Sequence, residues 1–279
     1  MNRQDYAGRT VFVTGGSMGI GLAAAKRFAA LGAHVTIFAR SAAPLEAAAA
    51  MLTRARATSQ QRIAHLQLDV TDHSRVVQVM SAVVAESGAP DVLVNCPGGA
   101  TPGYFEAILY ERFVGTLRVN LHSCWSTISA LVPHMKARGG YIVNTASLAG
   151  LIGVFGYTDY CAAKFGVIGF SEALRSELKP SNITVSVLCP PDTDTPGFAK
   201  ENVGKPAETK AVSAAAHVMT AEAVGDALLR GMARGTFLIV PGVESRLIAL
   251  AKRLAPGLVE YVMDRQIRGV RRPRSDGPV

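Results

Sequence analysis

The chain is poor in cysteine, and it lacks a long apolar run. Its four cysteines lie far apart among 279 residues, with no Cys-x-x-Cys pair and no histidine at metal-ligand spacing. This spacing argues against a structural zinc site and for reduced thiols in a cytoplasmic compartment. No stretch reaches the roughly 18 consecutive apolar residues of a transmembrane helix. The polar start, MNRQDYAGRT, predicts no signal peptide, so we expect a cytoplasmic protein without a metal.

Aliphatic residues are abundant, and 49% of the chain is hydrophobic. A domain of this length buries about 70–75% of its unfolded surface, so this content is ample for one core. The basic charge is uneven, because +5 of the net +8 lies in the 34 residues from Arg246 onward. Such a segment is compatible with a nucleic acid, an anionic membrane or solubility alone. No helix-turn-helix pattern or zinc spacing accompanies it, and we expect no nucleic-acid partner.

Short apolar runs alternate with segments of helical periodicity. The expected strands are Arg9–Thr14, His34–Ala39, Ile63–Leu68, Asp91–Val94, Tyr141–Thr145, Ile183–Leu188 and Thr236–Val240. The expected helices are Gly19–Leu31, Ala43–Ala57, Ser74–Glu86, Phe105–Met135, Tyr160–Leu178 and Glu222–Met232. Near-continuous apolar runs are typical of parallel strands that are buried on both faces. The alternation predicts an α/β fold with a doubly wound, mostly parallel seven-stranded sheet of the Rossmann type, in a single domain.

We expect this domain to span residues 1–242, with a ligand-facing loop at about 190–220, and a basic amphipathic helical tail at 243–279. Apolar residues recur at helical spacing in Leu247–Leu254 and Leu258–Val270. The basic residues between and beside them are Arg246, Lys252, Arg253, Arg265, Arg268, Arg271 and Arg272. Such helices lie on the surface of an anionic membrane, here its cytoplasmic face, or pack their apolar stripe against the domain or a second subunit. The sequence leaves both interpretations open.

A glycine-rich turn directly follows the first expected strand and opens a helix. Thr14–Gly21 reads Thr-Gly-Gly-Ser-Met-Gly-Ile-Gly. Glycines let the backbone approach a pyrophosphate, which then lies on the positive N-terminus of the helix. A plain strand-to-helix turn is the alternative, but the position after the first strand favours a dinucleotide site. Its expected contacts are Gly15, Ser17, Met18, Gly19, Ile20 and Gly21.

The end of the second expected strand indicates which dinucleotide binds. An NAD site would place Asp or Glu there to bind the ribose 2′-hydroxyl, whereas this chain has Arg40. A guanidinium cannot accept that hydrogen bond but suits a 2′-phosphate, so we expect NADPH. A solvated loop arginine is the alternative. Further contacts are expected where the next strands end, at Asp69, Val70 and Asn95.

Tyr160 and Lys164 are four residues apart on an expected helix, so the phenol and the ammonium share one face. A phenol with a pKa near 10 is a poor acid or base at neutral pH, and we expect the ammonium to lower that pKa. Ser147 follows the fifth expected strand, where its hydroxyl can hold a carbonyl group while Tyr160 donates a proton. Tyr157 lacks this arrangement, because Cys161 stands four residues after it.

Together these motifs resemble the short-chain dehydrogenase/reductase family over about residues 8–242. The family's Thr-Gly-x-x-x-Gly-x-Gly turn is matched at Thr14–Gly21, and its Tyr-x-x-x-Lys at Tyr160–Lys164. The resemblance implies an NADPH-dependent ketone oxidoreductase that forms a dimer or tetramer. It also implies that Asn120 holds a water through its backbone at a helix distortion and completes a proton relay with Ser147, Tyr160 and Lys164.

The chain departs from the family pattern at two places. The usual Asn-Asn-Ala-Gly is Asn-Cys-Pro-Gly at Asn95–Gly98, and the usual Pro-Gly is Pro190-Pro191. The resemblance still implies cofactor contacts from Pro190, Thr193 and Thr195.

A narrower resemblance concerns the segment Cys189–Phe198, the residues that follow it at Glu201-Asn202, Lys205-Pro206 and Glu208-Thr209, and the stretch Gly156–Tyr160. These segments are similar to the 3-ketodihydrosphingosine reductases, which reduce a sphingoid ketone to dihydrosphingosine with NADPH in sphingolipid biosynthesis. The resemblance implies a long-chain amino-ketone lipid as substrate, held at Ser147 and Tyr160. Asp192 or Asp194 would pair with its ammonium group, unless they cap the following helix. A β-ketoacyl or xenobiotic carbonyl substrate, or a non-catalytic dinucleotide-binding protein, are the alternatives.

Overall fold

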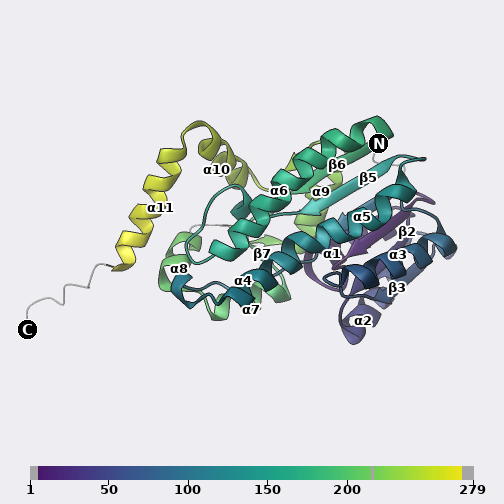
Figure 1. The fold of residues 1–279 in the computed structure, drawn as a ribbon, viewed down its shortest axis with the longest axis horizontal. Coiled ribbons are helices and arrows are strands. Elements are labelled where there is room, and N and C mark those ends of the chain that lie inside the picture. The colour runs from purple at the N-terminus through teal and green to yellow at the C-terminus, as the bar shows by residue number, and fades with distance from the viewer. Residues whose placement is uncertain (1–5, 215–216, 272–279) are drawn as a thin grey trace, which may run out of the picture.

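The computed structural model describes residues 6–214 and 217–271, and its centre is a seven-stranded sheet (Figure 1). The strand order is β3-β2-β1-β4-β5-β6-β9, and every neighbouring pair is parallel. The strands are β1 Thr10–Thr14, β2 His34–Ala39, β3 Ile63–Gln67, β4 Val92–Asn95, β5 Gly140–Thr145, β6 Ile183–Leu188 and β9 Leu238–Ile239. The doubly wound fold is confirmed, with a sheet that is wholly rather than mostly parallel. The last strand is shorter than expected, because it pairs only with the end of β6.

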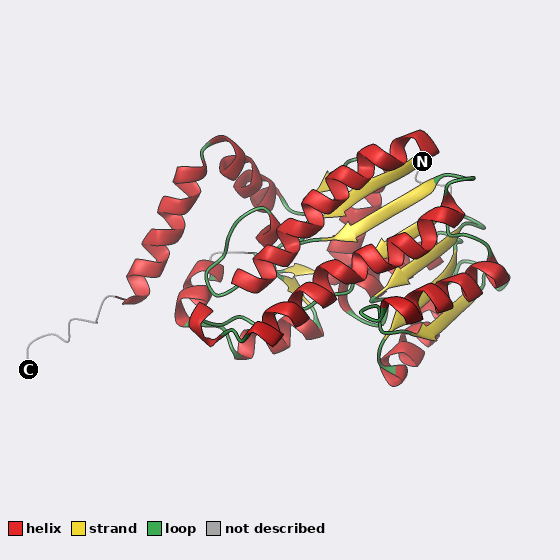
Figure 2. Ribbon diagram, in the orientation of Figure 1, coloured by secondary structure: helices red, strands yellow, loops and turns green. Residues whose placement is uncertain are grey.

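Helices cover both faces of this sheet (Figure 2). Alternate residues of β1 face opposite sides, so Val11 and Val13 belong to one buried cluster and Phe12 to another. The first cluster packs against α1 Gly19–Ala30, α2 Ala42–Ala55 and α9 Ala221–Ala233. The second packs against α3 His73–Ser87, α5 Ser123–Met135 and α6 Thr158–Leu178. Burial on both faces explains why these strands read as continuous apolar runs.

The structure contradicts the single long helix expected over Phe105–Met135, because it divides this stretch into several pieces. The pieces are the 3-10 turn η1 Phe105–Ala107, α4 Tyr110–Leu117, the π turn η2 Arg118–His122, and α5. Leu109 has an extended backbone, so the regular helix begins only at Tyr110. A π turn holds one residue more than an α turn, and such turns are frequent at functional sites. Two further 3-10 turns are η3 Leu148–Gly150 and η4 Lys179–Ser181.

The segment after β6 crosses the carboxyl edge of the sheet and is more structured than the loop expected at 190–220. It contains β7 Thr193–Asp194, α7 Pro196–Val203, α8 Ala207–Ser213 and β8 Met219–Thr220, and β7 pairs with β8. Thr195 caps α7, since its Oγ1 accepts a hydrogen bond from the Phe198 N–H at 3.1 Å. Neither Asp192 nor Asp194 therefore caps this helix.

The tail forms two helices, α10 Val243–Leu254 and α11 Pro256–Arg271, which project from one side of the molecule (Figure 1). The break falls at Ala255, and Pro256 takes the first position of α11, where its missing N–H costs nothing. α11 packs against α8, so part of the tail contacts the domain. Arg272 and the rest of the tail to residue 279 lie outside the described residues. Across the described ranges, no helix combines the length and apolar character needed to cross a bilayer.

Candidate active site

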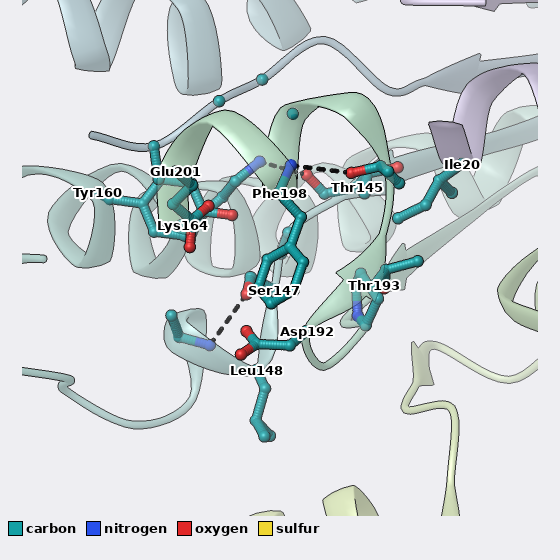
Figure 3. A pocket seen from close by; sticks show the side chains of 18 of the residues that line it. Ile20, Thr145, Ser147, Leu148, Tyr160, Lys164, Asp192, Thr193, Phe198 and Glu201 are labelled. Carbon is teal, nitrogen blue, oxygen red and sulfur yellow. Dashed lines mark hydrogen bonds between the residues drawn. The ribbon is translucent and has the colours of Figure 1, made fainter. Parts of the chain in front are cut away.

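A cavity of about 790 Å³ opens at the carboxyl edge of the sheet. Its walls come from the loops after β1 to β6, from α7, and from the two tail helices. The carboxyl ends of parallel strands meet at one edge, so residues far apart in the sequence converge there. Figure 3 shows Tyr160, Lys164 and Glu201 together at one side of this site, with Ser147 and Asp192 nearby.

The glycine-rich turn has the geometry of a phosphate cradle. Gly15 and Gly19 have φ angles of +68° and +55°, which favour glycine. A Cβ atom on Gly15 would lie 2.6 Å from the carbonyl oxygen of Cys96, so no side chain fits there. No side chain caps the N-terminus of α1, which leaves its first N–H groups available to an anion. The expected contacts Ser17, Met18, Ile20 and Gly21 line the cavity with them, and the turn therefore fits a dinucleotide.

Arg40, Asp69 and Val70 line the same cavity. The Arg40 side chain is exposed, and none of the described carboxylates forms a salt bridge with it. Asp69 instead stabilises its own loop, because its Oδ1 accepts hydrogen bonds from the N–H and hydroxyl of Thr71 at 2.9 and 2.8 Å. The guanidinium of Arg40 is thus available to a ligand.

Asn95 was expected to contact the cofactor, but its side chain points into the core and does not line the cavity. Its Oδ1 accepts hydrogen bonds from the hydroxyls of Thr14 and Thr127 at 2.9 and 2.8 Å. Its Nδ2 donates to Asn144 Oδ1 at 2.9 Å. The amide therefore ties β4 to β1, β5 and α5, and the cavity wall begins one residue later, at Cys96.

Tyr160, Lys164 and Ser147 are brought together, the first two by α6 and the third by the loop after β5. Lys164 Nζ lies 5.5 Å from the centroid of the Tyr160 ring and donates a hydrogen bond to the carbonyl oxygen of Thr145 at 2.9 Å. Ser147 Oγ accepts a hydrogen bond from the Ala149 N–H at 3.1 Å, which fixes its rotamer at the start of η3. The phenol and the serine hydroxyl thus share one cavity.

The surroundings of the phenol shift its pKa in the direction opposite to the lowering expected from Lys164. Burial raises the pKa of Tyr160, the charges of Glu201 and Asp192 raise it as well, and a hydrogen bond with Ser147 lowers it. Burial also lowers the pKa of Lys164. A raised pKa favours the neutral phenol, the form that can donate a proton.

Asn120 lies in the π turn η2, where the resemblance implied a helix distortion. Its Nδ2 donates hydrogen bonds to the carbonyl oxygens of Gly99 and Thr116, both at 3.0 Å. Asn120 does not itself line the cavity but lies behind Gly98. A Cβ atom on Gly98 would lie 2.8 Å from Asn120 Oδ1 and 3.3 Å from Lys164 Nζ, so the asparagine and the lysine approach each other across this glycine.

The residues after β6 divide between the cavity and the surface. Pro190, Asp192, Thr193 and Thr195 line the cavity. Asp194 was expected as a possible partner of the substrate ammonium, but it is exposed on β7 and is not part of the cavity wall.

Two groups of residues in the cavity wall or directly beside it were not assigned to the site from the sequence. Tyr157 donates a hydrogen bond to Glu201 Oε1, and Lys205 Nζ lies 3.4 Å from the same oxygen and 3.8 Å from Asp192 Oδ2. Burial raises the pKa of both carboxyl groups. The signal available in the sequence was that both residues belong to the stretch after Phe198 that resembles the 3-ketodihydrosphingosine reductases. The second group is the apolar wall that the tail supplies, namely Leu247, Ile248, Ala251, Leu258, Val259, Val262 and Met263.

The family model described as short chain dehydrogenase matches residues 9–206. A relative from Danio rerio, 3-dehydrosphinganine reductase, is 39% identical over 232 residues, which cover 82% of this chain and 70% of the relative. A 3-oxoacyl-[acyl-carrier-protein] reductase from Chlamydia trachomatis is 36% identical over 188 residues, covering 67% and 75% of the two chains. The crystal structure of levodione reductase has the same fold, with a TM-score of 0.78, 22% identity, and coverage of 86% and 99%. The chain therefore belongs to the short-chain dehydrogenase family of oxidoreductases.

Proposed function

We propose that this protein reduces 3-ketodihydrosphingosine to dihydrosphingosine with NADPH, a step of sphingolipid biosynthesis. The observation that carries the proposal is the cavity itself, which combines Tyr160 and Ser147 with an apolar wall from α10 and α11. Such a cavity suits a ketone with a long alkyl chain. The Danio rerio relative supports this substrate over a β-ketoacyl thioester, since it aligns with 232 residues and the oxoacyl reductase with 188.

The cavity residues divide the reduction of a carbonyl group between them. When bound, the nicotinamide dinucleotide supplies the hydride. The Ser147 hydroxyl donates a hydrogen bond that orients the ketone oxygen, and Tyr160 donates its phenolic proton to that oxygen as negative charge develops there. Lys164 stabilises the resulting phenolate and would hold the cofactor ribose. Asn120 positions a water at the π turn, from which the proton of Tyr160 is restored.

NADPH is the proposed cofactor because Arg40 presents an unpaired guanidinium to the cavity where an NAD site would have a carboxylate. Guanidinium and phosphate form charge-assisted, bidentate hydrogen bonds. The other proposed contacts are Gly15, Ser17, Met18, Gly19, Ile20, Gly21, Asp69, Val70, Tyr160, Lys164, Pro190, Thr193 and Thr195.

The proposed function predicts a strong preference for the long-chain ketone. In mixed micelles, followed by the loss of NADPH absorbance, we expect kcat/KM for 3-ketodihydrosphingosine to exceed that for a short β-ketoester at least about 100-fold. The reason is that each buried methylene contributes about 0.8 kcal/mol. Faster turnover of the ketoester would support the assignment as a reductase but contradict the sphingoid ketone as its substrate. No turnover of any ketone would favour a non-catalytic dinucleotide-binding protein.

We infer that residues 1–242 form the reductase unit, with residues 190–220 as its substrate segment, and that the tail at 243–279 brings it to a membrane. Apolar side chains remain exposed on both tail helices beside basic ones. The apolar ones include Val243, Leu247, Leu250, Leu254, Leu258, Tyr261 and Val262. Exposed Arg253, Arg265 and Arg268 give this surface the charge that an anionic bilayer attracts. The enzyme would then be cytoplasmic and peripheral on that face of the membrane.

Charge reversal on the tail tests this contact in the full chain. The triple variant Arg253→Glu, Arg265→Glu, Arg268→Glu is expected to bind phosphatidylserine vesicles at least about 100-fold more weakly in a flotation assay, because each basic residue contributes about 1 kcal/mol near such a surface. The matched control reverses the exposed Arg54, Lys136 and Lys179 elsewhere on the molecule. Equal vesicle binding by both triple variants would remove the membrane proposal.

We also propose a homo-oligomer formed through the helices that carry Asn120 and Tyr160. Large side chains are exposed along α4, α5 and α6, and they include Tyr110, Trp125 and Phe165, which are 75%, 52% and 45% exposed. Aromatic residues are enriched in the cores of protein interfaces. Sedimentation of the protein as a monomer at micromolar concentration would contradict this proposal.

A further inference from the structure

Two carboxylates in the wall of the cavity beside Tyr160 share one salt-bridge cation, because the ammonium of Lys164, which also lines the cavity, donates its hydrogen bond to the carbonyl oxygen of Thr145. Asp192 and Glu201 both line the cavity, and Lys205 is the one cation that forms a salt bridge with either of them within residues 6–214 and 217–271. The carboxylate side chains are only 30% and 16% exposed. Removing an uncompensated charge from water is unfavourable, so a second cation would stabilise this arrangement.

Each of the two carboxylates is held in place through one oxygen, and its other oxygen accepts no hydrogen bond from the described residues. Glu201 Oε1 takes both the Tyr157 hydrogen bond and the contact with Lys205, and the contact of Lys205 with Asp192 is to Oδ2. The side chain of Lys205 is itself 3% exposed and lies 4.5 Å above the Phe198 ring, so packing keeps the ammonium between the two acids. Glu201 Oε2 and Asp192 Oδ1 have no hydrogen-bond donor among the described side chains and backbone.

These carboxylates lie next to the reacting end of the cavity. The rings of Tyr157 and Tyr160 are 5.8 Å apart between centroids, and Glu201 and Asp192 are close enough for their charges to raise the pKa of Tyr160. Figure 3 shows Glu201 beside Tyr160 and Asp192 on the side of Ser147. A cationic group of the substrate that binds here would therefore be a few covalent bonds away from a carbonyl carbon whose oxygen contacts Tyr160 and Ser147.

We propose that Glu201 and Asp192 bind the ammonium group of the substrate and so select 2-amino ketones, with Lys205 and Tyr157 as positioning residues. This inference rests on the proposed function, in which the substrate carries an ammonium on the carbon next to its carbonyl. The ammonium supplies the missing positive charge and donors for the free carboxylate oxygens. A β-ketoacyl thioester carries no cation and leaves the negative charge uncompensated, which is how a site rejects a wrong substrate.

The test compares two ketones that differ only in the amino group. We expect the wild-type enzyme to prefer 3-ketodihydrosphingosine over its 2-deamino analogue at least about 100-fold in kcat/KM, since loss of one partner of a buried charge pair has effects of that size. In Glu201→Gln this ratio should fall at least about 10-fold, mainly through KM of the amino ketone. The control Glu177→Gln, at an exposed glutamate on α6, should keep the wild-type ratio.

The outcomes separate this proposal from the function on which it rests. If the wild-type enzyme reduces both ketones equally well, or if Glu201→Gln lowers kcat/KM for both by the same factor, the reductase assignment stands and the ammonium site is overturned. If the wild-type enzyme reduces neither ketone, the proposed function itself fails. Should Glu201→Gln not fold, Asp192→Asn carries the same ratio measurement, and an unchanged ratio there overturns the proposal.

Discussion

The variant Tyr160→Phe is expected to lose about 10³-fold or more of kcat for the ketone, while the dissociation constant for NADPH changes little. The reason is that the phenolic proton of Tyr160 has no replacement in the cavity, and general acid catalysis contributes about 10²–10⁴-fold. Phenylalanine keeps the ring that Lys164 approaches at 5.5 Å, so the packing of α6 is retained. Steady-state turnover measures the first quantity, and quenching of NADPH fluorescence measures the second.

The matched control is Tyr110→Phe, which removes a hydroxyl from an exposed tyrosine on α4 that is not part of the cavity wall. It should turn over at the wild-type rate. If Tyr160→Phe kept a tenth of wild-type kcat, Tyr160 would not be the proton donor.

The second large effect concerns the choice of dinucleotide. Arg40→Asp is expected to lower the ratio of kcat/KM for NADPH to that for NADH by about 10³-fold. A charged hydrogen bond contributes about 1.5–3 kcal/mol, and the new carboxylate both repels a 2′-phosphate and accepts a hydrogen bond from a 2′-hydroxyl. The ratio is measured with one ketone at a fixed, saturating concentration.

The control for the change in net charge is Arg54→Asp. It makes the same substitution at an exposed position of α2 that does not line the cavity. That variant should keep the wild-type ratio. Equal efficiency of the wild-type enzyme with NADPH and NADH would already contradict the role of Arg40.

The sequence was sufficient to predict the sheet and much of the site, because both depend on local patterns. Parallel strands buried on two faces need continuous apolar runs, and this is why Val11, Phe12 and Val13 predict a strand without knowledge of its neighbours. The four-residue spacing of Tyr160 and Lys164 fixes their common face in the same way.

What the sequence could not predict depends on contacts between distant segments. The extended backbone at Leu109 and the π turn at Asn120 interrupt a stretch that has continuous helical periodicity. Asn95 was expected at the cofactor because it ends a strand, yet Thr14, Thr127 and Asn144 together draw its amide into the core. Glu201 becomes a cavity residue, with Lys205 beside it, only because the chain after β6 folds back as α7 over the edge of the sheet.

The apolar wall of the cavity has a consequence for how such enzymes diversify. It comes from α10 and α11, which follow the last strand, whereas Ser147, Tyr160 and Lys164 come from the middle of the chain. The residues that carry out the reaction and the residues that contact the alkyl chain of the substrate are therefore encoded in separate stretches of the gene. Substitutions accumulating in the last two helices can retune which alkyl chains fit, while leaving the proton-donating machinery untouched.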